Sequence, residues 1–128
     1  MQKWTTPRSI PLPDRISGAD LSGKEGYGVA VSGATYVLAS DGGADCVGFL
    51  SYAGTASGDV CSANTGEVFA VHEGALTANH LADTTVDATG QIRTAVSGET
   101  VCVITLETST TALDVRRIIH RQTLDTHA

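Results

Sequence analysis

Short runs of alternating apolar and polar residues cover most of the chain between residues 27 and 119. In the segment YGVAVS, the side chains of Tyr27, Val29 and Val31 share one face of an expected strand. Similar runs, rich in β-branched or aromatic residues and bounded by Gly, Asp, Asn or Ser, are TYVLAS, CVGFLSY, GDVCS, GEVFAVH, QIRTAVS, VCVITLET and LDVRRII. The pattern predicts an all-β fold: one compact small β-barrel or sandwich of about eight short strands.

The same alternation predicts which apolar side chains fill the core of this β-fold. The residues assigned to the core are Val29, Val31, Leu38, Phe49, Leu50, Val68, Val71, Ile92, Val103 and Leu106. No segment shows a convincing helical stripe, except for one short turn expected around residues 77–81. A circular-dichroism spectrum dominated by helix would contradict this interpretation.

The stretch GALTANHLADTTVDATGQIRTA, residues 74–95, is composed mainly of Thr, Ala, Asp and Gly. Its turn signal is Asp87-Ala88-Thr89-Gly90, so the stretch is expected to form a smooth hairpin. Side chains this small lose little conformational entropy when they lie against another surface. Two interpretations remain open: the hairpin lies flat on another protein, with Leu76 and Thr77 in contact, or it is an ordinary solvent-exposed connector.

Residues 1–22 are expected to form an extended arm, followed by an all-β body at residues 23–119 and a polar tail at residues 120–128. All three prolines of the chain lie in the arm, and they prevent a continuous helix there. The arm also contains the apolar residues Trp4, Ile10 and Leu12, which are poorly suited to lying free in water. The arm is therefore expected to dock, either on its own body or on a neighbour.

We expect this arm to run extended across an adjacent protein subunit. Trp4 or Ile10 would fill an apolar groove there, and part of the arm would add to a sheet edge. Arg8 and Arg15 would pair with acidic groups of the body or of the neighbour. Removal of residues 1–16 is then expected to leave the isolated body folded, while binding to the adjacent subunit falls sharply.

The charges of the chain are distributed unevenly. The net charge is −6, and residues 25–115 contain eleven acids against one base, Arg93. The first 24 residues and the last 13 residues each carry a net charge of +2. The bases at the C-terminal end are Arg116, Arg117 and Arg121. The acidic body argues against nucleic acid as a partner, whereas the basic ends reflect either chance or contacts with acidic patches on neighbouring protein.

The composition favours a protein that meets other protein. Charged residues make up only 17% of the chain and glycines number 14, although a secreted domain of low charge has a similar composition. Cys46, Cys61 and Cys102 form no C-x-x-C pair and lie in apolar segments, so they are expected to be buried, reduced thiols. No signal peptide or membrane span is recognised, and synthesis in a reducing cytoplasm is expected.

Candidate catalytic and metal-binding residues do not form a known pattern. His72 and His80 are eight positions apart, not the four that place two imidazoles on one helical face. Asp41 and Asp45 resemble half of a calcium loop, but a tight turn is favoured because the other ligands are missing. We therefore expect no enzyme activity, no cofactor and no metal site.

The order of the segments resembles the small bacteriophage capsid decoration proteins, which are also called cement proteins. The opening GADLSGKEGYGVAVSGATYVLAS, residues 18–40, is similar to the Asp-Leu-Ser segment and first hairpin of that family. The matching motifs further along are Gly48–Leu50, Gly54–Val60, Gly66–Val68, Gly74–Ala78 and Asp87–Arg93. The sequence departs from the family at residues 78–80, in the segment VCVITLE, and in the long arm with its prolines.

This resemblance implies a virion protein without enzyme activity that binds the outside of an assembled phage head and stabilises it. Its partners would be the major capsid protein and further copies of itself, most often as trimers, with dimers as an alternative. Multivalent clamping of several capsid subunits would resist the internal pressure of the DNA. The alternative is a β-sandwich module of a virion that binds a ligand or carbohydrate, although such modules usually carry a row of exposed aromatic residues.

Overall fold

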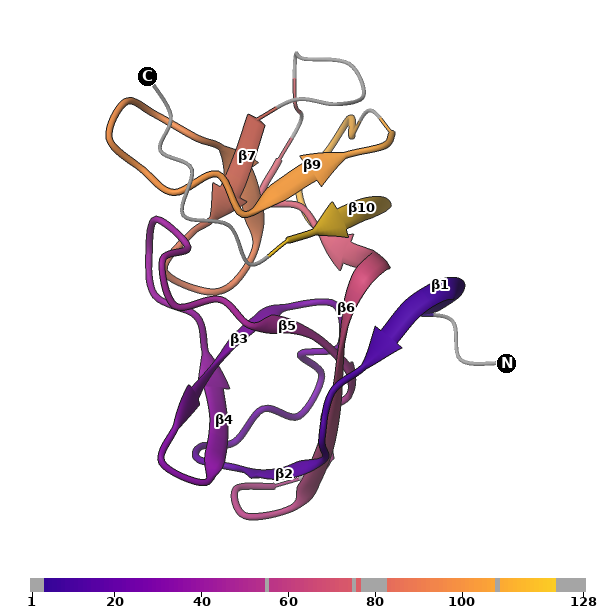
Figure 1. The fold of residues 1–128 in the computed structure, drawn as a ribbon, viewed down its shortest axis with the longest axis vertical. Coiled ribbons are helices and arrows are strands. Elements are labelled where there is room, and N and C mark those ends of the chain that lie inside the picture. Colours follow the sequence, from indigo (N-terminus) through magenta and orange to yellow (C-terminus); the bar gives the residue numbers. More distant parts are fainter. Residues whose placement is uncertain (1–3, 55, 75, 77–82, 108, 122–128) are drawn as a thin grey trace.

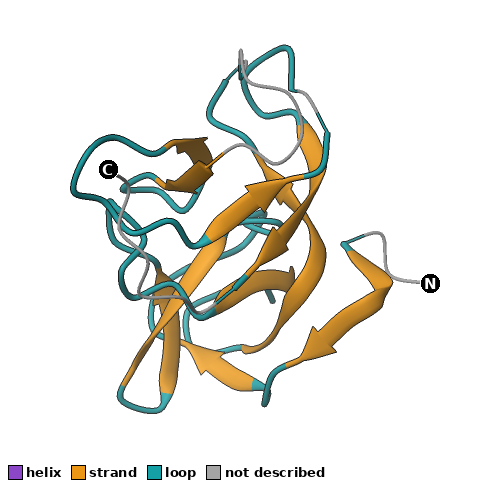
Figure 2. Ribbon diagram, turned by 45° about the horizontal axis from the view of Figure 1, so that its top comes forward, coloured by secondary structure: helices purple, strands orange, loops and turns teal. Residues whose placement is uncertain are grey.

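The structure is a computed structural model that describes residues 4–54, 56–74, 76, 83–107 and 109–121. All regular secondary structure in these ranges is β (Figure 1; Figure 2). The ten strands are β1 (Thr5–Pro11), β2 (Arg15–Ser17), β3 (Gly28–Ser32), β4 (Thr35–Leu38), β5 (Gly48–Tyr52), β6 (Val60–Val71), β7 (Asp83–Val86), β8 (Ile92–Thr94), β9 (Val103–Thr105) and β10 (Val115–His120). The all-β fold class expected from the sequence is confirmed.

Five of the strands close into a small barrel. β2 runs parallel to β4, and β4, β3, β5 and β6 then pair in that order, each antiparallel to the next. The barrel closes where β6 returns to β2, with Cys61 opposite Arg15 and Val60 opposite Ile16. The apolar side chains that pack together in the barrel core are Leu21, Val29, Tyr36, Leu50, Ala53, Cys61 and Ala63. Closure removes the free edges that an open five-stranded sheet would expose.

The sheet continues beyond the barrel along the C-terminal half of β6. That half pairs with β10, and β9, β7 and β8 follow in spatial order. A second core consists of Ala39, Cys46, Phe49, Val68, Ala70, Leu76, Val86, Ile92, Cys102, Val103 and Ile118. Phe49 belongs to a barrel strand, whereas Ile118 belongs to β10. The second core therefore joins the barrel to the rest of the sheet.

Strand β6 belongs to both halves of the molecule, as Figure 1 shows. The sequence pattern predicts two strands here, GDVCS and GEVFAVH, because Gly66 was expected to mark a boundary. In the structure Gly66 has a φ of +79° and lies inside one strand of 12 residues. A glycine in this conformation bends a strand without ending it. Gly66 therefore allows one strand to serve two cores.

The N-terminal segment pairs with its own chain. β1 lies antiparallel to β6, with Pro11 opposite Asn64, and β2 is a strand of the barrel. Leu12 donates its N–H to the carbonyl of Ala63 in β6. Backbone nitrogens of consecutive strand residues point to opposite sides, so the nitrogen of Pro11 points away from β6, toward the open edge. Proline has no N–H to offer a further strand at that edge. The described part of the arm is therefore part of the sheet of its own chain.

This arrangement changes the expectation for the truncation of residues 1–16. The truncation removes all of β1 and also Arg15 and Ile16, whose pairs with β6 close the barrel. We therefore no longer expect the truncated chain to retain an intact body.

The Trp4 side chain packs against Gly26, which has a φ of +83°. A methyl group built on Gly26 would lie 2.7 Å from Cζ3 of the Trp4 ring and 3.1 Å from Cγ2 of Val71. The pairing of the N-terminal segment with β6 also lets the carbonyl of Trp4 accept a hydrogen bond from the N–H of Phe69 at 3.2 Å. The glycine at position 26 therefore makes room for the indole ring on its own body.

Replacing Trp4 by Ala is expected to lower the free energy of unfolding by about 2 kcal/mol, because a half-buried indole loses its packing. The cost of Gly26→Ala should then be smaller in the Trp4→Ala background than in the wild type, since the ring no longer obstructs the new methyl group. Chemical denaturation of the four proteins measures this coupling. Strictly additive effects would show that the ring does not lie on Gly26.

Most of the predicted core residues are buried. Seven of them have exposed fractions of 5% or less: Val29, Phe49, Leu50, Val68, Val71, Ile92 and Val103. Leu38 is half-buried against the barrel core. Val31 is wrongly assigned, because it stands at the exposed end of β3 with 42% of its surface accessible. Leu106 is half-buried, since it alternates with the inward-facing Val103 and Thr105.

Strand β7 of the small-residue hairpin packs into its own molecule, so this part of the stretch is not an exposed connector. The buried residues of β7 are Thr84, Thr85 and Val86. The turn forms as expected, with the Asp87 carboxylate accepting the N–H groups of Thr89 at 2.8 Å and Gln91 at 3.0 Å. At the tip, the carbonyl of Gly90 accepts the N–H of Gly28 in β3 at 2.8 Å. Small side chains allow this close approach to the barrel.

Candidate functional site

The N-terminal residues that the sequence suggested for an interface differ in their exposure. Arg8 and Ile10 are exposed on β1. The half-buried ones are Trp4, Leu12 and Arg15. Leu12 packs against the barrel core, and the guanidinium of Arg15 lies 5.7 Å from the centre of the Tyr36 ring. Of this group, only Arg8 and Ile10 are openly available to a partner.

The C-terminal arginines do not form one basic patch. Arg116 and Arg117 are neighbours on β10, so their side chains point to opposite faces of the sheet. Arg116 lies 3.4 Å from the carboxylate of Asp114. Arg117 pairs with two glutamates of its own chain, and Arg121 is exposed just after β10. Two of the three charges are thus neutralised within the protein.

The region of Leu76 is hollow rather than flat. Leu76 is buried in the second core, and its N–H donates to the hydroxyl of Ser109 at 3.1 Å. A cavity of about 310 Å³ is lined by Glu73, Gly74, Leu76, Ile92, Arg93, Thr94 and Val96. Thr77, the other suggested hairpin contact, lies outside the described residues. The described part of this region therefore offers no flat docking surface.

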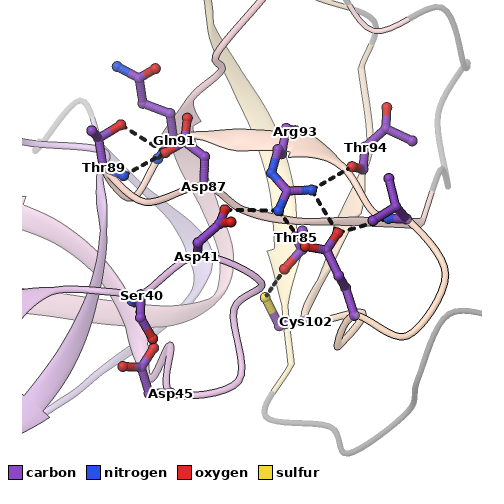
Figure 3. A network of polar contacts seen from close by, with 12 residues as sticks. Ser40, Asp41, Asp45, Thr85, Asp87, Thr89, Gln91, Arg93, Thr94 and Cys102 are labelled. Carbon is purple, nitrogen blue, oxygen red and sulfur yellow. Dashed lines mark hydrogen bonds and ion pairs between the residues drawn. The ribbon is translucent and has the colours of Figure 1, made fainter.

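Arg93 is held between two carboxylates, as Figure 3 shows. It donates to Glu99 and, at 2.9 Å, to Asp41. The bonds to Glu99 and then Asp41 raise the pKa of Arg93, so the guanidinium stays charged. Asp45, at the other end of the DGGAD segment, accepts the N–H of Ser40 at 3.0 Å. These aspartates therefore stabilise a turn and its attachment to β8.

A first exposed apolar patch lies on the outside of the barrel. Ile16 and Val60 are directly opposite each other in β2 and β6, and both are exposed. Tyr52 on β5 is opposite Ser62, which shares a strand face with Val60. The three exposed side chains, Ile16, Tyr52 and Val60, thus span three neighbouring strands. We call them the barrel patch.

A second exposed apolar patch lies at the other end of β6. Val115 is opposite Val71, the last residue of β6, and the N–H of Leu113 donates to the carbonyl of His72 at 2.9 Å. Leu113 has 61% of its surface exposed, the largest value among the exposed large apolar side chains in the described ranges. Half-buried Trp4 lies on the same face beside Val71. We call Leu113, Val115 and Trp4 the distal patch.

The loop that carries Leu113 is hydrogen-bonded within itself and strained at Leu113. Leu113 has a φ of +65°, a conformation that costs a residue with a side chain about 1 kcal/mol. The neighbouring carboxylate of Asp114 accepts the N–H groups of Thr110 at 2.7 Å and Thr111 at 3.1 Å, and these bonds lower its pKa. The loop therefore holds an apolar side chain in water at a cost to stability. Strain of this kind is common where a residue serves a binding function.

Polar contacts connect the strands next to the distal patch. The hydroxyl of Thr6 donates to Glu67 at 2.9 Å, and the guanidinium of Arg117 lies 3.6 Å from Glu67 and 2.9 Å from Glu107. These contacts run across β1, β6 and β10. They fix this face of the sheet, so that little side-chain freedom would be lost when a partner binds.

No three His, Cys, Asp or Glu side chains in the described ranges are grouped so that they could hold a metal ion. His72 is buried, and burial lowers its pKa, while its Nδ1 lies 3.2 Å from the carbonyl of Ala70. In the same part of the chain, no helix is long and apolar enough to cross a membrane.

Sequence reasoning missed five exposed apolar residues of the two patches. These are Ile16, Tyr52, Val60, Leu113 and Val115. A signal existed for Leu113, because it interrupts the polar turn residues Thr110, Thr111 and Asp114. For the barrel patch, no signal distinguishes an outward apolar residue of a strand from an inward one before the strand register is known.

Comparison with known proteins adds no relative to this description. A scan of the sequence against protein-family models finds no match, and a search of curated proteins finds no significant similarity.

Proposed function

We propose that this protein binds the outer surface of an assembled bacteriophage head and stabilises it as a capsid decoration protein. The observation that supports the proposal is the presence of exposed apolar patches at opposite ends of β6, the strand shared by both halves of the molecule. A strand of 12 residues spans up to roughly 35 Å, so the patches can meet different neighbours. The resemblance of the sequence to decoration proteins favours capsid subunits as those neighbours.

The mechanism is clamping by two weak contacts. Burial of one Val or Leu side chain contributes on the order of 2 kcal/mol, which is small for a single interface. Contact at both ends makes the second binding step intramolecular, and many copies on one shell add their effects. The partners under this proposal are the major capsid protein and further copies of this chain, with trimers as the expected oligomer. The acidic charge of the body suits a position outside the capsid, away from packaged DNA.

A carbohydrate-binding module is not favoured by the positions of the aromatic side chains. Tyr36, Phe49 and Tyr27 are buried, and Tyr52 is the only aromatic residue among the exposed large apolar side chains in the described ranges. A row of exposed rings, which such a module uses to stack on sugars, is not formed by these residues.

Replacing Leu113 by Asn should separate binding from stability. Asn tolerates a positive φ better than Leu, so the free energy of unfolding should stay the same or rise by about 1 kcal/mol. The occupancy of the protein on expanded heads of its cognate major capsid protein should fall at least tenfold. Co-sedimentation with heads and thermal unfolding of the free protein measure the two effects.

Val60→Asn tests the barrel patch, and Val96→Asn is the matched control. Val60 and Val96 have nearly equal exposed fractions, 56% and 58%, but Val96 belongs to neither patch. Occupancy should fall for Val60→Asn and remain at the wild-type level for Val96→Asn. The proposal also expects binding to expanded heads and not to unexpanded precursors. It would be wrong if the Leu113 and Val60 variants both decorated heads as well as the wild type.

A further inference from the structure

Two cysteines that are far apart in the sequence lie in the same core. Cys46 lies two positions before β5, a strand of the barrel, and Cys102 immediately precedes β9 in the other half of the molecule. Both are buried, unpaired thiols of the second core. Cys61, the third cysteine, is buried in the barrel core instead. Position alone therefore singles out Cys46 and Cys102 as a possible pair.

The two thiols interact and differ in their acidity. The side-chain hydrogen bond between Cys46 and Cys102 raises the pKa of Cys46 and lowers the pKa of Cys102. The hydroxyl of Thr85 lies 3.9 Å from Sγ of Cys102 and also favours its thiolate. Because the thiolate is the reactive form of cysteine, Cys102 is the nucleophile of the pair and Cys46 is its neighbour.

One short loop covers Cys102, as the close view in Figure 3 shows. A methyl group built on Gly43 of this loop would lie 2.7 Å from Sγ of Cys102, so the loop backbone packs directly on the thiol. The loop is fastened by the ion pair of Asp41 with Arg93 and by the N–H of Gly42, which donates to the carbonyl of Val86 at 3.0 Å. Local opening of a surface loop needs far less free energy than global unfolding. Opening of residues 40–46 therefore gives a small oxidant access to Cys102.

We propose that Cys46 and Cys102 form an intramolecular disulfide when the protein meets a two-electron thiol oxidant such as an azodicarboxamide. The Cys102 thiolate attacks one nitrogen of the azo bond and forms a sulfur–nitrogen bond. The Cys46 thiolate then attacks Sγ of Cys102, the sulfur–sulfur bond forms, and the sulfur–nitrogen bond breaks. The two electrons and the two thiol protons leave on the hydrazine product. This inference does not depend on the proposed function.

The bond would join the barrel to the β9 side of the sheet. A disulfide that closes a long loop restricts the unfolded chain and so raises stability. Oxidation is therefore expected to raise the midpoint of thermal unfolding, and reduction should restore the original value.

The test treats the Cys61→Ala variant with diamide and follows the intact mass, the non-reducing peptide map and thermal unfolding. The expected result is loss of the mass of two hydrogen atoms, a linked peptide pair that contains Cys46 and Cys102, and a higher unfolding midpoint. Cys46→Ala and Cys102→Ala, each shown to be folded by circular dichroism, should remain without an intramolecular bond.

In the Asp41→Ala variant, the covering loop loses its ion pair with Arg93. Diamide then reaches Cys102 more easily, so that access does not limit the reaction. The proposal would be overturned if the Cys46 and Cys102 thiols stayed free after diamide treatment in both the wild type and Asp41→Ala. It would also be overturned if the linked peptides contained Cys61 in place of either partner.

Discussion

Replacing Gly90 by Ala is expected to lower the free energy of unfolding by about 4 kcal/mol, a large fraction of the stability of a domain of this size. Gly90 has a φ of +81°, which costs an L-residue roughly 1 kcal/mol or more. A methyl group at this position would also lie 2.6 Å from the carbonyl oxygen and 3.0 Å from the nitrogen of Gly28. These are backbone atoms of a barrel strand, so they cannot rotate away as a side chain can.

The hairpin would have to move away from β3, and this movement breaks the hydrogen bond from the N–H of Gly28 to Gly90. Leaving such buried groups unpaired costs about 1–3 kcal/mol. Urea denaturation followed by circular dichroism measures the total effect.

Gly58→Ala provides the matched control for this experiment. Gly58 has a φ of +85°, close to that of Gly90, but a methyl group there would meet no atom within 4 Å. This variant should therefore lose only about 1 kcal/mol, from backbone strain alone. Equal losses in Gly58→Ala and Gly90→Ala would show that the hairpin tip does not press against the barrel.

Acidification from pH 6.5 to about pH 4 is expected to remove about 3 kcal/mol of stability through His120 alone. The ring of His120 is buried, with Nδ1 2.6 Å from the hydroxyl of Thr65 and Nε2 3.1 Å from the carbonyl of Cys46. A carbonyl only accepts hydrogen bonds, so Nε2 carries the proton and Nδ1 accepts from Thr65. The neutral imidazole is thus fully bonded. Burial lowers the pKa of His120 from 6.5 to about 4.

The direction of the pH effect follows from this lowered pKa. Above pH 6.5 the ring is neutral in both the folded and the unfolded protein, and the stability is complete. As the pH falls below 6.5, the unfolded chain binds a proton at His120 while the folded protein does not, until the pH reaches about 4. Stability is therefore lost across this window. Burial lowers the pKa of His72 as well, so its contribution has the same sign.

His120→Gln should reduce the pH dependence without abolishing the fold. Gln can still donate a hydrogen bond to Cys46, but it does not titrate. The variant is expected to be less stable at neutral pH and to lose less stability between pH 6.5 and 4 than the wild type. Urea denaturation across this range provides the measurement. An unchanged slope in the variant would contradict the assignment to His120.

The strand pattern was readable from the sequence because β-branched and aromatic residues alternate between punctuating glycines and aspartates. The alternation placed Val29, Phe49 and Leu50 correctly in the core. It failed for Val31, because β3 continues beyond the barrel core and its last two residues are exposed. Leu106 failed for a different reason: a strand that buries Val103 also buries the residue two positions on, not three.

The fate of the N-terminal segment depended on information that the local sequence does not contain. Prolines correctly excluded a helix, but they do not exclude an edge strand whose open side needs no N–H. The pairing of β1 with β6 joins residues far apart in the chain, and Gly26 reveals its role only once Trp4 is seen to lie on it. Long-range pairing, not local propensity, made this segment part of the sheet.

The exposed patches were the least predictable feature. Val60 and Val68 belong to the same strand and have the same character, yet one is exposed and the other is buried. The difference arises because Val68 faces the second core, whereas Val60 lies on the outside of the barrel with 56% of its surface exposed. Only the tertiary arrangement contains that distinction.

The position of β6 in the chain has a consequence for folding during synthesis. All five barrel strands lie between residues 15 and 71, so the barrel can close while later segments are still being translated. The C-terminal half of β6 must wait for β10, which begins at Val115, and until then it exposes an unpaired edge to other nascent chains. This delay makes the C-terminal half of β6 an aggregation risk during synthesis. The order of translation thus sets the order of folding, with the barrel first and the half that carries the distal patch last.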